Sequence, residues 1–226
     1  MRSKFFILFL TFVLVSPSLF SQKKHRYGTG TKIDIIAGVD LQNFYGSDFW
    51  GEALKNRFQP GFHAGADINI PLIPDFYLQA GLLIHNKGSR QDTVAGSIKT
   101  ASLYYAEIPV NFLFRPQLGD GHIMIGFGPF LAYGFYGSEN IKTGGKSDRL
   151  RVRFLNNASD QPTKYAYYRP LDAGAAIQIG YELYSNVFFQ AGAQMGLLKI
   201  NPGYGLANDK SSRKNIGFGF SAGYRF

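Results

Sequence analysis

The final twelve residues of the chain, 215–226, alternate between apolar residues and small or polar ones. One face of a β-strand over this stretch would carry Ile216, Phe218, Phe220, Ala222, Tyr224 and Phe226. The other face would carry Asn215, Gly217, Gly219, Ser221, Gly223 and Arg225. This division is typical of a transmembrane β-barrel, whose strands face lipid outside and a narrow bore inside. The chain also finishes on an aromatic residue, so we interpret the stretch as the closing strand of a barrel.

The same alternation predicts seven strands before the last one. They cover residues 32–41, 61–70, 76–85, 103–115, 122–133, 171–182 and 187–197. In the first of them, Ile33, Ile35 and Val39 share one face, whereas Asp34 and Asp40 share the other. The total of eight strands is even, so the two ends of the chain are expected on the same, periplasmic side of the membrane.

Two of the predicted strands contain a proline, Pro109 in 103–115 and Pro129 in 122–133. Proline has no backbone N–H to donate to a neighbouring strand, so each proline is expected to mark a β-bulge. For this reason the alternation in 122–133 is followed only as far as Gly128.

The connections between the predicted strands alternate in length. Those after the second, fourth and sixth strands are short, whereas the others cover 42–60, 86–102, 134–170 and 199–212. Short periplasmic turns and long outer loops are typical of bacterial outer-membrane barrels. The prediction is therefore an all-β protein, an eight-stranded closed antiparallel transmembrane (outer-membrane) β-barrel. A soluble ligand-holding barrel is the alternative, but it would turn its aromatic residues inward.

Residues 1–21 have the pattern of a cleavable signal peptide. Arg2 and Lys4 precede a short apolar run, and Ser21 stands before Gln22. A retained helical anchor is the alternative, but the run is shorter than a membrane-spanning helix needs. The chain has no cysteine, which excludes a lipoprotein anchor and disulfides. The expected division is a signal peptide, 1–21, and one outer-membrane barrel domain, 22–226.

Composition supports the all-β prediction. Aromatic residues make up 16% of the chain and there are 27 glycines, as in proteins built from short strands separated by turns. The longest apolar run after the start, 123–135, is interrupted by Gly126, Gly128, Pro129 and Gly134. No linker divides the chain, so a single domain is expected.

Four short motifs resemble a known family. They are Tyr-Ala-Glu-Ile-Pro-Val-Asn at 105–111, Gly-Phe-Gly-Pro-Phe at 126–130, Gln-Met-Gly-Leu at 194–197 and Gly-Tyr-Arg-Phe at 223–226. With them the chain resembles the outer-membrane β-barrel proteins of Bacteroidetes that are often labelled PorT-like. The resemblance implies an eight-stranded outer-membrane barrel and supplies no catalytic residue. The protein that gives the family its label takes part in type IX secretion.

The predicted inward faces mix acidic, basic and neutral polar side chains. The acids are Asp34, Asp40, Asp67, Glu107 and Asp172, and the others are His63, Arg115, Arg225, Tyr77, Tyr105, Asn69, Asn111, Gln178, Gln190 and Gln194. An eight-stranded barrel has a bore just wide enough for side chains to fill. Charges inside it must be paired or hydrogen-bonded. We therefore predict a closed, ion-paired interior without an open pore.

A lipid hydrolase is a hypothesis to weigh, because such an enzyme needs a nucleophile beside an oriented base. His63 or His85 could be the base and Glu107 the orienting group, with a nucleophile among Ser47, Ser89 and Ser102. Their spacing matches no hydrolase motif, and no group of His, Asp and Glu has a metal-ligand spacing. The prediction is no enzyme, with no catalytic, cofactor-binding or metal-binding residue and no cofactor.

Basic residues outnumber acidic ones, 24 against 15, and only Arg2 and Lys4 belong to the predicted signal peptide. Many lie in the third and fourth long connections: Lys142, Lys146, Arg149, Arg151, Arg153, Lys164 and Arg169, then Lys199, Lys210, Arg213 and Lys214. Outside the membrane they would meet the phosphates of lipopolysaccharide. The alternative is a solvated charged loop. The basic residues form no nucleic-acid-binding motif.

These observations favour a non-enzymatic outer-membrane barrel with a structural or interaction role. The expected partners are outer-membrane lipid and lipopolysaccharide, together with other envelope or secretion proteins, and no nucleic acid. A role in a secretion assembly of the PorT-like type is the finer hypothesis. A small transport or ligand-binding barrel and a lipid-modifying enzyme are the alternatives.

Overall fold

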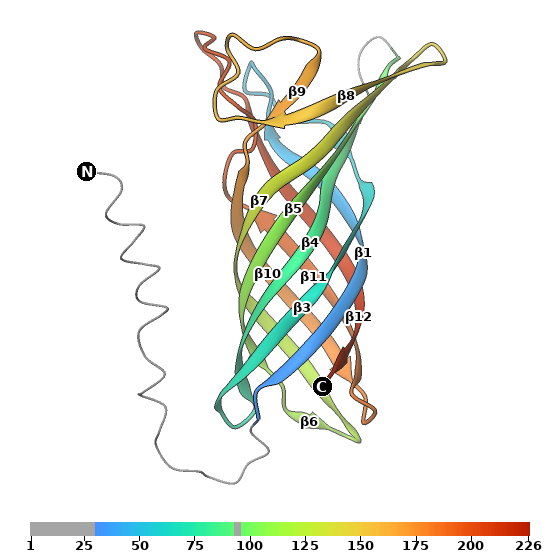
Figure 1. The fold of residues 1–226 in the computed structure, drawn as a ribbon, viewed down its shortest axis with the longest axis vertical. Coiled ribbons are helices and arrows are strands. Elements are labelled where there is room, and N and C mark those ends of the chain that lie inside the picture. The colour runs from blue at the N-terminus through green and yellow to red at the C-terminus, as the bar shows by residue number, and fades with distance from the viewer. Residues whose placement is uncertain (1–29, 93–95) are drawn as a thin grey trace, which may run out of the picture.

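The computed structural model describes residues 30–92 and 96–226, so the predicted signal peptide lies outside the described residues. Twelve strands are present in this part of the chain (Figure 1). They are β1 (Lys32–Ser47), β2 (Asn56–Arg57), β3 (Gln59–Ile73), β4 (Phe76–Asp92), β5 (Ile98–Phe114), β6 (Gln117–Leu118), β7 (Gly121–Thr143), β8 (Lys146–Phe154), β9 (Tyr165–Tyr168), β10 (Leu171–Glu182), β11 (Val187–Gly196) and β12 (Ser212–Arg225).

Eight of the strands form a closed antiparallel ring, in the order β1, β3, β4, β5, β7, β10, β11 and β12. The pairing of β12 with β1 and that of β7 with β10 close the ring. Closure leaves no strand edge in the wall, so backbone N–H and C=O groups are paired between neighbours. The predicted eight-stranded barrel is confirmed. No described segment is a helix long and apolar enough to cross a membrane.

The inside and outside faces are those predicted from the alternation. On β12, Phe218 and Phe220 are 49% and 55% exposed, whereas Asn215 and Arg225 are 1% and 3% exposed. On β1, Asp34 and Asp40 are likewise buried in the bore. On β7 the alternation continues beyond Gly128 as far as the register shift described below.

The strands reach further at one end of the barrel than the alternation predicts. At this loop end, β4 continues to Asp92 and β7 to Thr143, and β8 and β9 lie inside the expected third loop, 134–170. The predicted long loops are therefore partly wrong. The reason is physical: beyond the lipid layer a strand need not show apolar side chains outward, so the pattern stops while the hydrogen-bonded ladder continues. The opposite, turn end has tight connections, with Asp75 and Asn186 at positive φ.

The prediction of bulges at the two prolines is wrong. Neither Pro109 nor Pro129 coincides with a register shift. The ladder between β5 and β7 shifts instead between Tyr104 and Tyr105, where β7 carries one extra residue. Pro109 lies at a gap in the β4–β5 ladder and stays paired with β7. Pro129 lies at a gap in the β5–β7 ladder and stays paired with β10. The missing N–H of each proline therefore interrupts pairing with one neighbouring strand without changing the register.

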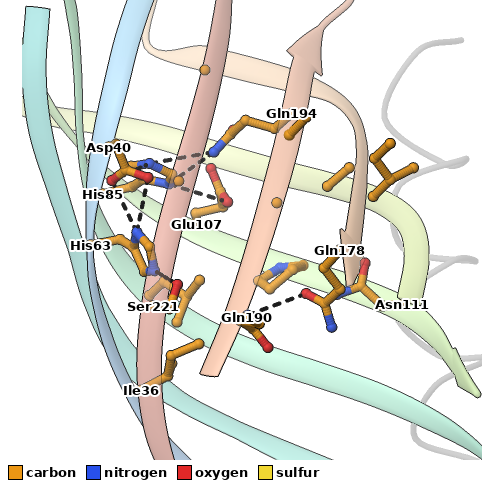
Figure 2. A pocket seen from close by; sticks show the side chains of 18 of the residues that line it. Ile36, Asp40, His63, His85, Glu107, Asn111, Gln178, Gln190, Gln194 and Ser221 are labelled. Carbon is orange, nitrogen blue, oxygen red and sulfur yellow. Dashed lines mark hydrogen bonds and ion pairs between the residues drawn. The ribbon is translucent and has the colours of Figure 1, made fainter. Parts of the chain in front are cut away.

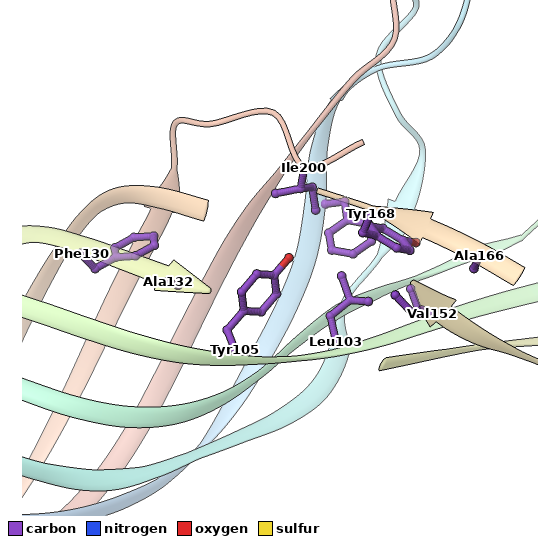
Figure 3. Packing of buried hydrophobic residues seen from close by; sticks show 10 residues of the cluster. Leu103, Tyr105, Phe130, Ala132, Val152, Ala166, Tyr168 and Ile200 are labelled. Carbon is purple, nitrogen blue, oxygen red and sulfur yellow. The ribbon is translucent and has the colours of Figure 1, made fainter. Parts of the chain in front are cut away.

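Two apolar clusters lie inside the bore, one near each end. The larger consists of Phe44, Ala101, Leu103, Tyr105, Phe130, Ala132, Val152, Ala166, Tyr168 and Ile200 (Figure 3). It receives residues from β8, β9 and the connection after β11, and we call it the outer plug. The smaller cluster consists of Ile36, Leu113, Met124 and Phe188. Between the two clusters lies a polar layer of the bore, and the ion pairs of Asp34 with Arg225 and of Arg115 with Glu182 lie at the turn end beyond Ile36 and Leu113.

Candidate functional site

The polar layer contains a lysine that crosses the bore from β4. The Nζ atom of Lys87 lies 2.7 Å from Glu107 Oε2 on β5 and 3.1 Å from Asp172 Oδ2 on β10. Asn215 Nδ2 on β12 donates to the same Asp172 oxygen at 2.8 Å. The Lys87 ammonium also lies 4.2 Å from the centre of the Phe130 ring. One fully buried cation therefore joins opposite walls and touches the outer plug.

A second ionic cluster lies toward the turn end. Arg225 on β12 donates from Nε and Nη2 to both carboxylate oxygens of Asp34, at 2.8 and 2.7 Å. Its Nη1 donates to Glu182 Oε2 at 2.5 Å, and Arg115 Nε donates to the same oxygen at 2.7 Å. Bidentate charged hydrogen bonds of this kind are the strong ones. The cluster ties the ends of β12, β1 and β10 together.

Two histidines and an aspartate meet between these clusters (Figure 2). Asp40 comes from β1, His63 from β3 and His85 from β4. His63 Nδ1 lies 2.9 Å from Asp40 Oδ2, and His85 Nε2 lies 3.2 Å from the same oxygen. On its other side, His63 Nε2 lies 2.7 Å from Ser221 Oγ on β12. His85 Nδ1 lies 3.5 Å from Glu107 Oε1, which links this cluster to Lys87.

Two glycines make space for these side chains. A Cβ on Gly38 would lie 2.5 Å from the His63 ring, and a Cβ on Gly219 would lie 2.3 Å from Asp40 Oδ1. Both glycines face the bore, so the small residues of the inward faces accommodate the large polar ones. A cavity of about 90 Å³ lies beside the cluster. Its lining also includes amide side chains that hydrogen-bond in a chain across the bore, namely Gln79, Asn111, Gln178 and Gln190.

A family model described as the outer membrane protein beta-barrel domain matches residues 20–201. The chain belongs to this outer-membrane barrel family. OprG from Pseudomonas aeruginosa is similar in structure, with a TM-score of 0.51, 12% identity, and coverage of 88% of this chain and 97% of that chain. Ail, the attachment invasion locus protein of Yersinia pestis, has a TM-score of 0.41 and 14% identity, with 87% and 99% covered. No curated protein matches the chain.

The lipid-facing surface of this outer-membrane barrel has aromatic contacts at two levels. Near the turn end, the Phe76 and Phe114 rings are 4.6 Å apart, and toward the loop end the Tyr104 and Tyr136 rings are 5.5 Å apart. Phe114 and Tyr104 are both on β5, with ten residue steps between them. A tilted strand crosses the hydrocarbon layer in about 9–11 residues. The separation of the two levels matches one hydrocarbon thickness, and β5 and β7 project beyond Tyr104 and Tyr136 at the loop end.

The projecting strand β8 is amphipathic. Its residues Leu150, Val152 and Phe154 face the outer plug, whereas Arg149, Arg151 and Arg153 are exposed. Because β8 pairs with β7 and β9, its arginines are held on a sheet rather than in the long loop, 134–170, expected from sequence. Of the other predicted basic loop residues, Lys146 begins β8 and Lys142 lies on the part of β7 that pairs with β8, whereas others lie elsewhere. Arg213 and Lys214, for example, lie on β12.

A buried tyrosine joins the outer plug to the projecting strands. Tyr168 on β9 donates to Glu139 Oε1 on β7 at 2.5 Å, and Lys99 Nζ lies 2.9 Å from Glu139 Oε2. Burial raises the pKa of the Tyr168 hydroxyl well above its ordinary value of 10.0, and the neighbouring Glu139 carboxylate acts in the same direction. The neutral hydroxyl is therefore the form that fits this site.

The structure separates the serines that the sequence suggested from both histidines. Ser47 Oγ donates to the Lys210 carbonyl, Ser102 Oγ accepts from Asn86, and Ser89 is buried near the outer end. The serine that does contact a histidine is Ser221. Sequence reasoning placed it on the inward face but did not select it, because only the register of β12 against β1 brings it near His63.

Ser221, His63 and Asp40 have the order of groups found in a Ser-His-Asp hydrolase. Ser221 is 4% exposed and faces the bore, so membrane lipid outside the wall does not reach it. Its backbone is paired with Gly38 on one side and Gln190 on the other. Neighbouring N–H groups within such ladders are not free to bind an oxyanion.

Proposed function

We propose that this protein is a non-enzymatic outer-membrane barrel with a closed interior that holds a rigid basic sheet outside the cell for interaction with envelope components. The observation that carries the proposal is the filling of the bore. Lys87 crosses the polar layer between Glu107 and Asp172, and the outer plug lies directly above it. Such an interior supports anchoring better than it supports passage of solutes.

Single-channel recording in a planar bilayer tests the closed interior. We expect no steady large conductance from the folded protein. A matched variant, Leu103→Gly combined with Phe130→Gly, removes two large side chains from the outer plug and should increase brief openings. A steady large conductance from the unaltered protein would support the transport alternative and contradict the proposal.

The partner is inferred from the motif resemblance and from the exposed charge. The PorT-like motifs at 105–111 and 126–130 favour a role beside secretion or other envelope proteins. The arginines of β8 favour anionic groups, among which lipopolysaccharide phosphates are the nearest in an outer membrane. The projecting sheet is the surface that we propose for either partner, which makes it the place to test.

Photo-cross-linking from this sheet tests the interaction role. A photoreactive residue replaces Arg151, which is exposed, and the same residue replaces Leu82 on the lipid-facing wall as a control. We expect position 151 to capture a reproducible envelope component in native cells, identified by mass spectrometry, and position 82 to capture lipid. Identical products at both positions would contradict the interaction role.

A hydrolase is the second candidate, because His63 contacts Ser221 through one ring nitrogen and Asp40 through the other. Labelling with a fluorophosphonate tests it directly, with Ser221→Ala as the matched control. We expect no labelling, because the serine lies inside the bore. Labelling that disappears in Ser221→Ala, together with hydrolysis of a phospholipid or lipid A ester, would establish the enzyme instead.

A further inference from the structure

We infer that Asp40, His63 and His85 form a binding site for a divalent transition-metal ion inside the barrel, with Zn²⁺ as the representative ion. The ligand atoms would be Asp40 Oδ2, His63 Nδ1 and His85 Nε2. Imidazole nitrogen and carboxylate oxygen are ligands that Zn²⁺ and its neighbours in the first transition series accept.

The distances among these atoms fit one ion. His63 Nδ1 and His85 Nε2 lie 2.9 and 3.2 Å from Asp40 Oδ2, and the ligand atoms of the cluster all lie within 4.8 Å of one another. Zn–N and Zn–O bonds of roughly 2.0–2.1 Å place two ligands of a tetrahedral ion about 3.3 Å apart. Two of the three separations are therefore already close to this value, and a small rotation of the rings supplies the third.

The far nitrogen of each ring has a partner that orients it. His63 Nε2 is 2.7 Å from Ser221 Oγ. His85 Nδ1 is 3.1 Å from the amide nitrogen of Gln194 and 3.5 Å from Glu107 Oε1. Rotation of the Gln194 amide by half a turn would direct its buried Oε1, which has no hydrogen-bond partner among the described residues, toward this nitrogen. Metal-binding histidines generally donate their second N–H to such a hydroxyl, carboxylate or carbonyl group, which leaves the first nitrogen free to bind the ion. The hydrogen bonds that resemble a hydrolase triad are thus also those of an oriented metal ligand.

A fourth ligand is close to the cluster. The amide nitrogen of Gln42 lies 3.0 Å from His85 Nε2, and Gln42 is 1% exposed. Its Oε1 atom is buried and has no hydrogen-bond partner among the described residues. Rotation of the amide by half a turn would direct this oxygen toward the ion. The adjoining cavity of about 90 Å³ is also large enough for a water molecule in that position.

The charges of the described interior favour an added cation. Apart from Glu139 at the loop end, which is paired with Lys99, the buried carboxylates are Asp34, Asp40, Asp67, Glu107, Asp172 and Glu182. The cations that contact them without needing to gain a proton are Lys87, Arg115 and Arg225. Carboxylates therefore exceed these cations, and an isolated buried charge is expensive. A divalent ion bound to two neutral histidines offsets two of the excess negative charges at the position where Asp40 meets both rings.

The strand register positions the ligands before any ion arrives. His63 is directly opposite His85 in the ladder between β3 and β4, and Gly38 is opposite His63 in the ladder between β1 and β3. The three ligands therefore project from adjacent strands of the same wall, as Figure 2 shows. A substitution at a single ligand can remove the site without removing a strand.

Metal content measured on the purified barrel tests the site. The protein is folded in detergent without an affinity tag, incubated with Zn²⁺ and desalted. His25, which lies outside the described residues, is replaced by glutamine in every sample so that it does not bind Zn²⁺. We expect one Zn²⁺ per chain by elemental mass spectrometry. His63→Gln and His85→Gln should each lose at least roughly ten-fold in affinity, since even outer partners of metal ligands contribute that much. His122→Gln is the matched control, because His122 lies near Arg115 at the periplasmic end and should leave binding unchanged.

A second measurement, the unfolding temperature with and without Zn²⁺, tests the site on the unaltered protein even if a histidine variant does not fold. Zn²⁺ that binds the folded chain must raise its unfolding temperature. We expect such a rise in the unaltered protein and in His122→Gln, and its loss in Asp40→Asn. Ser221→Ala should retain binding with roughly ten-fold lower affinity, because it removes an orienting partner and no ligand. Failure of the unaltered protein to retain Zn²⁺ or to gain thermal stability would overturn the site, as would equal binding by the His63→Gln, His85→Gln double variant.

Discussion

The polar layer of the bore and the projecting β8 strand both carry permanent positive charge, but they accommodate it differently. Lys87 in the bore is 1% exposed and lies between two carboxylates. Arg151 on β8 is exposed, while its neighbour Val152 packs into the outer plug. In the bore a charge is stabilised by a partner on another strand. On β8 the charges are exposed to water, with Arg149 donating to Ser138 and the Arg153 guanidinium lying 4.0 Å from the centre of the Tyr165 ring. The opposite, apolar face of the same strand is the one that packs against the outer plug.

This difference indicates where each region is sensitive to change. A buried charge that loses its partner keeps its desolvation cost, so the bore depends on complete networks. An exposed arginine that is replaced leaves nothing buried behind. The predictions below test this contrast, in decreasing order of expected effect on stability.

Lys87→Met should have the largest effect. It leaves Glu107 and Asp172 buried without their shared cation, and breaking a buried pair in this way costs about 3–5 kcal/mol. The free energy of unfolding in lipid vesicles, measured by urea titration with tryptophan fluorescence, checks this value.

A triple variant separates the network from the side-chain volume. Lys87→Met with Glu107→Gln and Asp172→Asn removes all three charges together, and it should recover most of the lost stability. If the triple variant is as unstable as Lys87→Met alone, the lost contact of the Lys87 ammonium with the Phe130 ring explains the loss, and the contrast with β8 fails.

Leu103→Ala should destabilise the barrel by about 3 kcal/mol, because Leu103 is fully buried in the outer plug and its removal leaves a cavity. Leu82→Ala is the matched control. Leu82 is 60% exposed and faces lipid on the same barrel, so its truncation leaves no internal cavity. The same unfolding measurement applies. Equal losses from both variants would indicate that the plug is not packed as a core.

Tyr168→Phe should cost about 1.5–3 kcal/mol, because it removes a hydrogen bond to the Glu139 carboxylate. The tyrosine also predicts a pH dependence. Its pKa is raised in the folded state, so its contribution is complete below the ordinary value of 10.0 and is lost as the pH rises above that value. Urea unfolding at a series of pH values between 8 and 11 should show this loss, and the loss should be smaller in Tyr168→Phe. Parallel curves for the two proteins would count against a buried neutral tyrosine.

The strand faces could be predicted from sequence because lipid imposes a period of two on every wall strand. The bounds of β10, 171–182, agree with the prediction for the same reason. Where the lipid layer ends that constraint disappears, so the sequence could not indicate that β7 continues to Thr143. The outer plug was also missed. Leu103 and Phe130 are inward apolar residues, whereas the pattern for the bore anticipates small or polar ones.

The candidate site was predictable only in part. Asp40 and His63 were assigned to the inward face and His85 was named as a possible base, but their meeting depends on which residues of adjacent strands are opposite each other. The ladders pair His63 with His85 and with Gly38, and alternation alone leaves that register open. Residue spacing along the chain cannot reveal a three-residue cluster whose members come from three strands.

Charge reversal on β8 should have the smallest effect on stability and the clearest effect on association. Arg149→Glu, Arg151→Glu and Arg153→Glu together should change the free energy of unfolding by roughly 0.5 kcal/mol or less per site, because exposed substitutions rarely do more. Binding to lipopolysaccharide vesicles should weaken, and most strongly at low salt.

The control for this change has the same net charge. Lys55→Glu, Arg90→Glu and Lys210→Glu reverse three exposed basic residues outside β8. If binding depends on the ordered arginines of the sheet, the β8 variant loses more affinity than this control. If the two variants lose affinity equally, net charge alone attracts the vesicles. The exposed face of β8 would then be a solvated surface that recognises no particular ligand. The bore and β8 would differ in the burial of their charges alone.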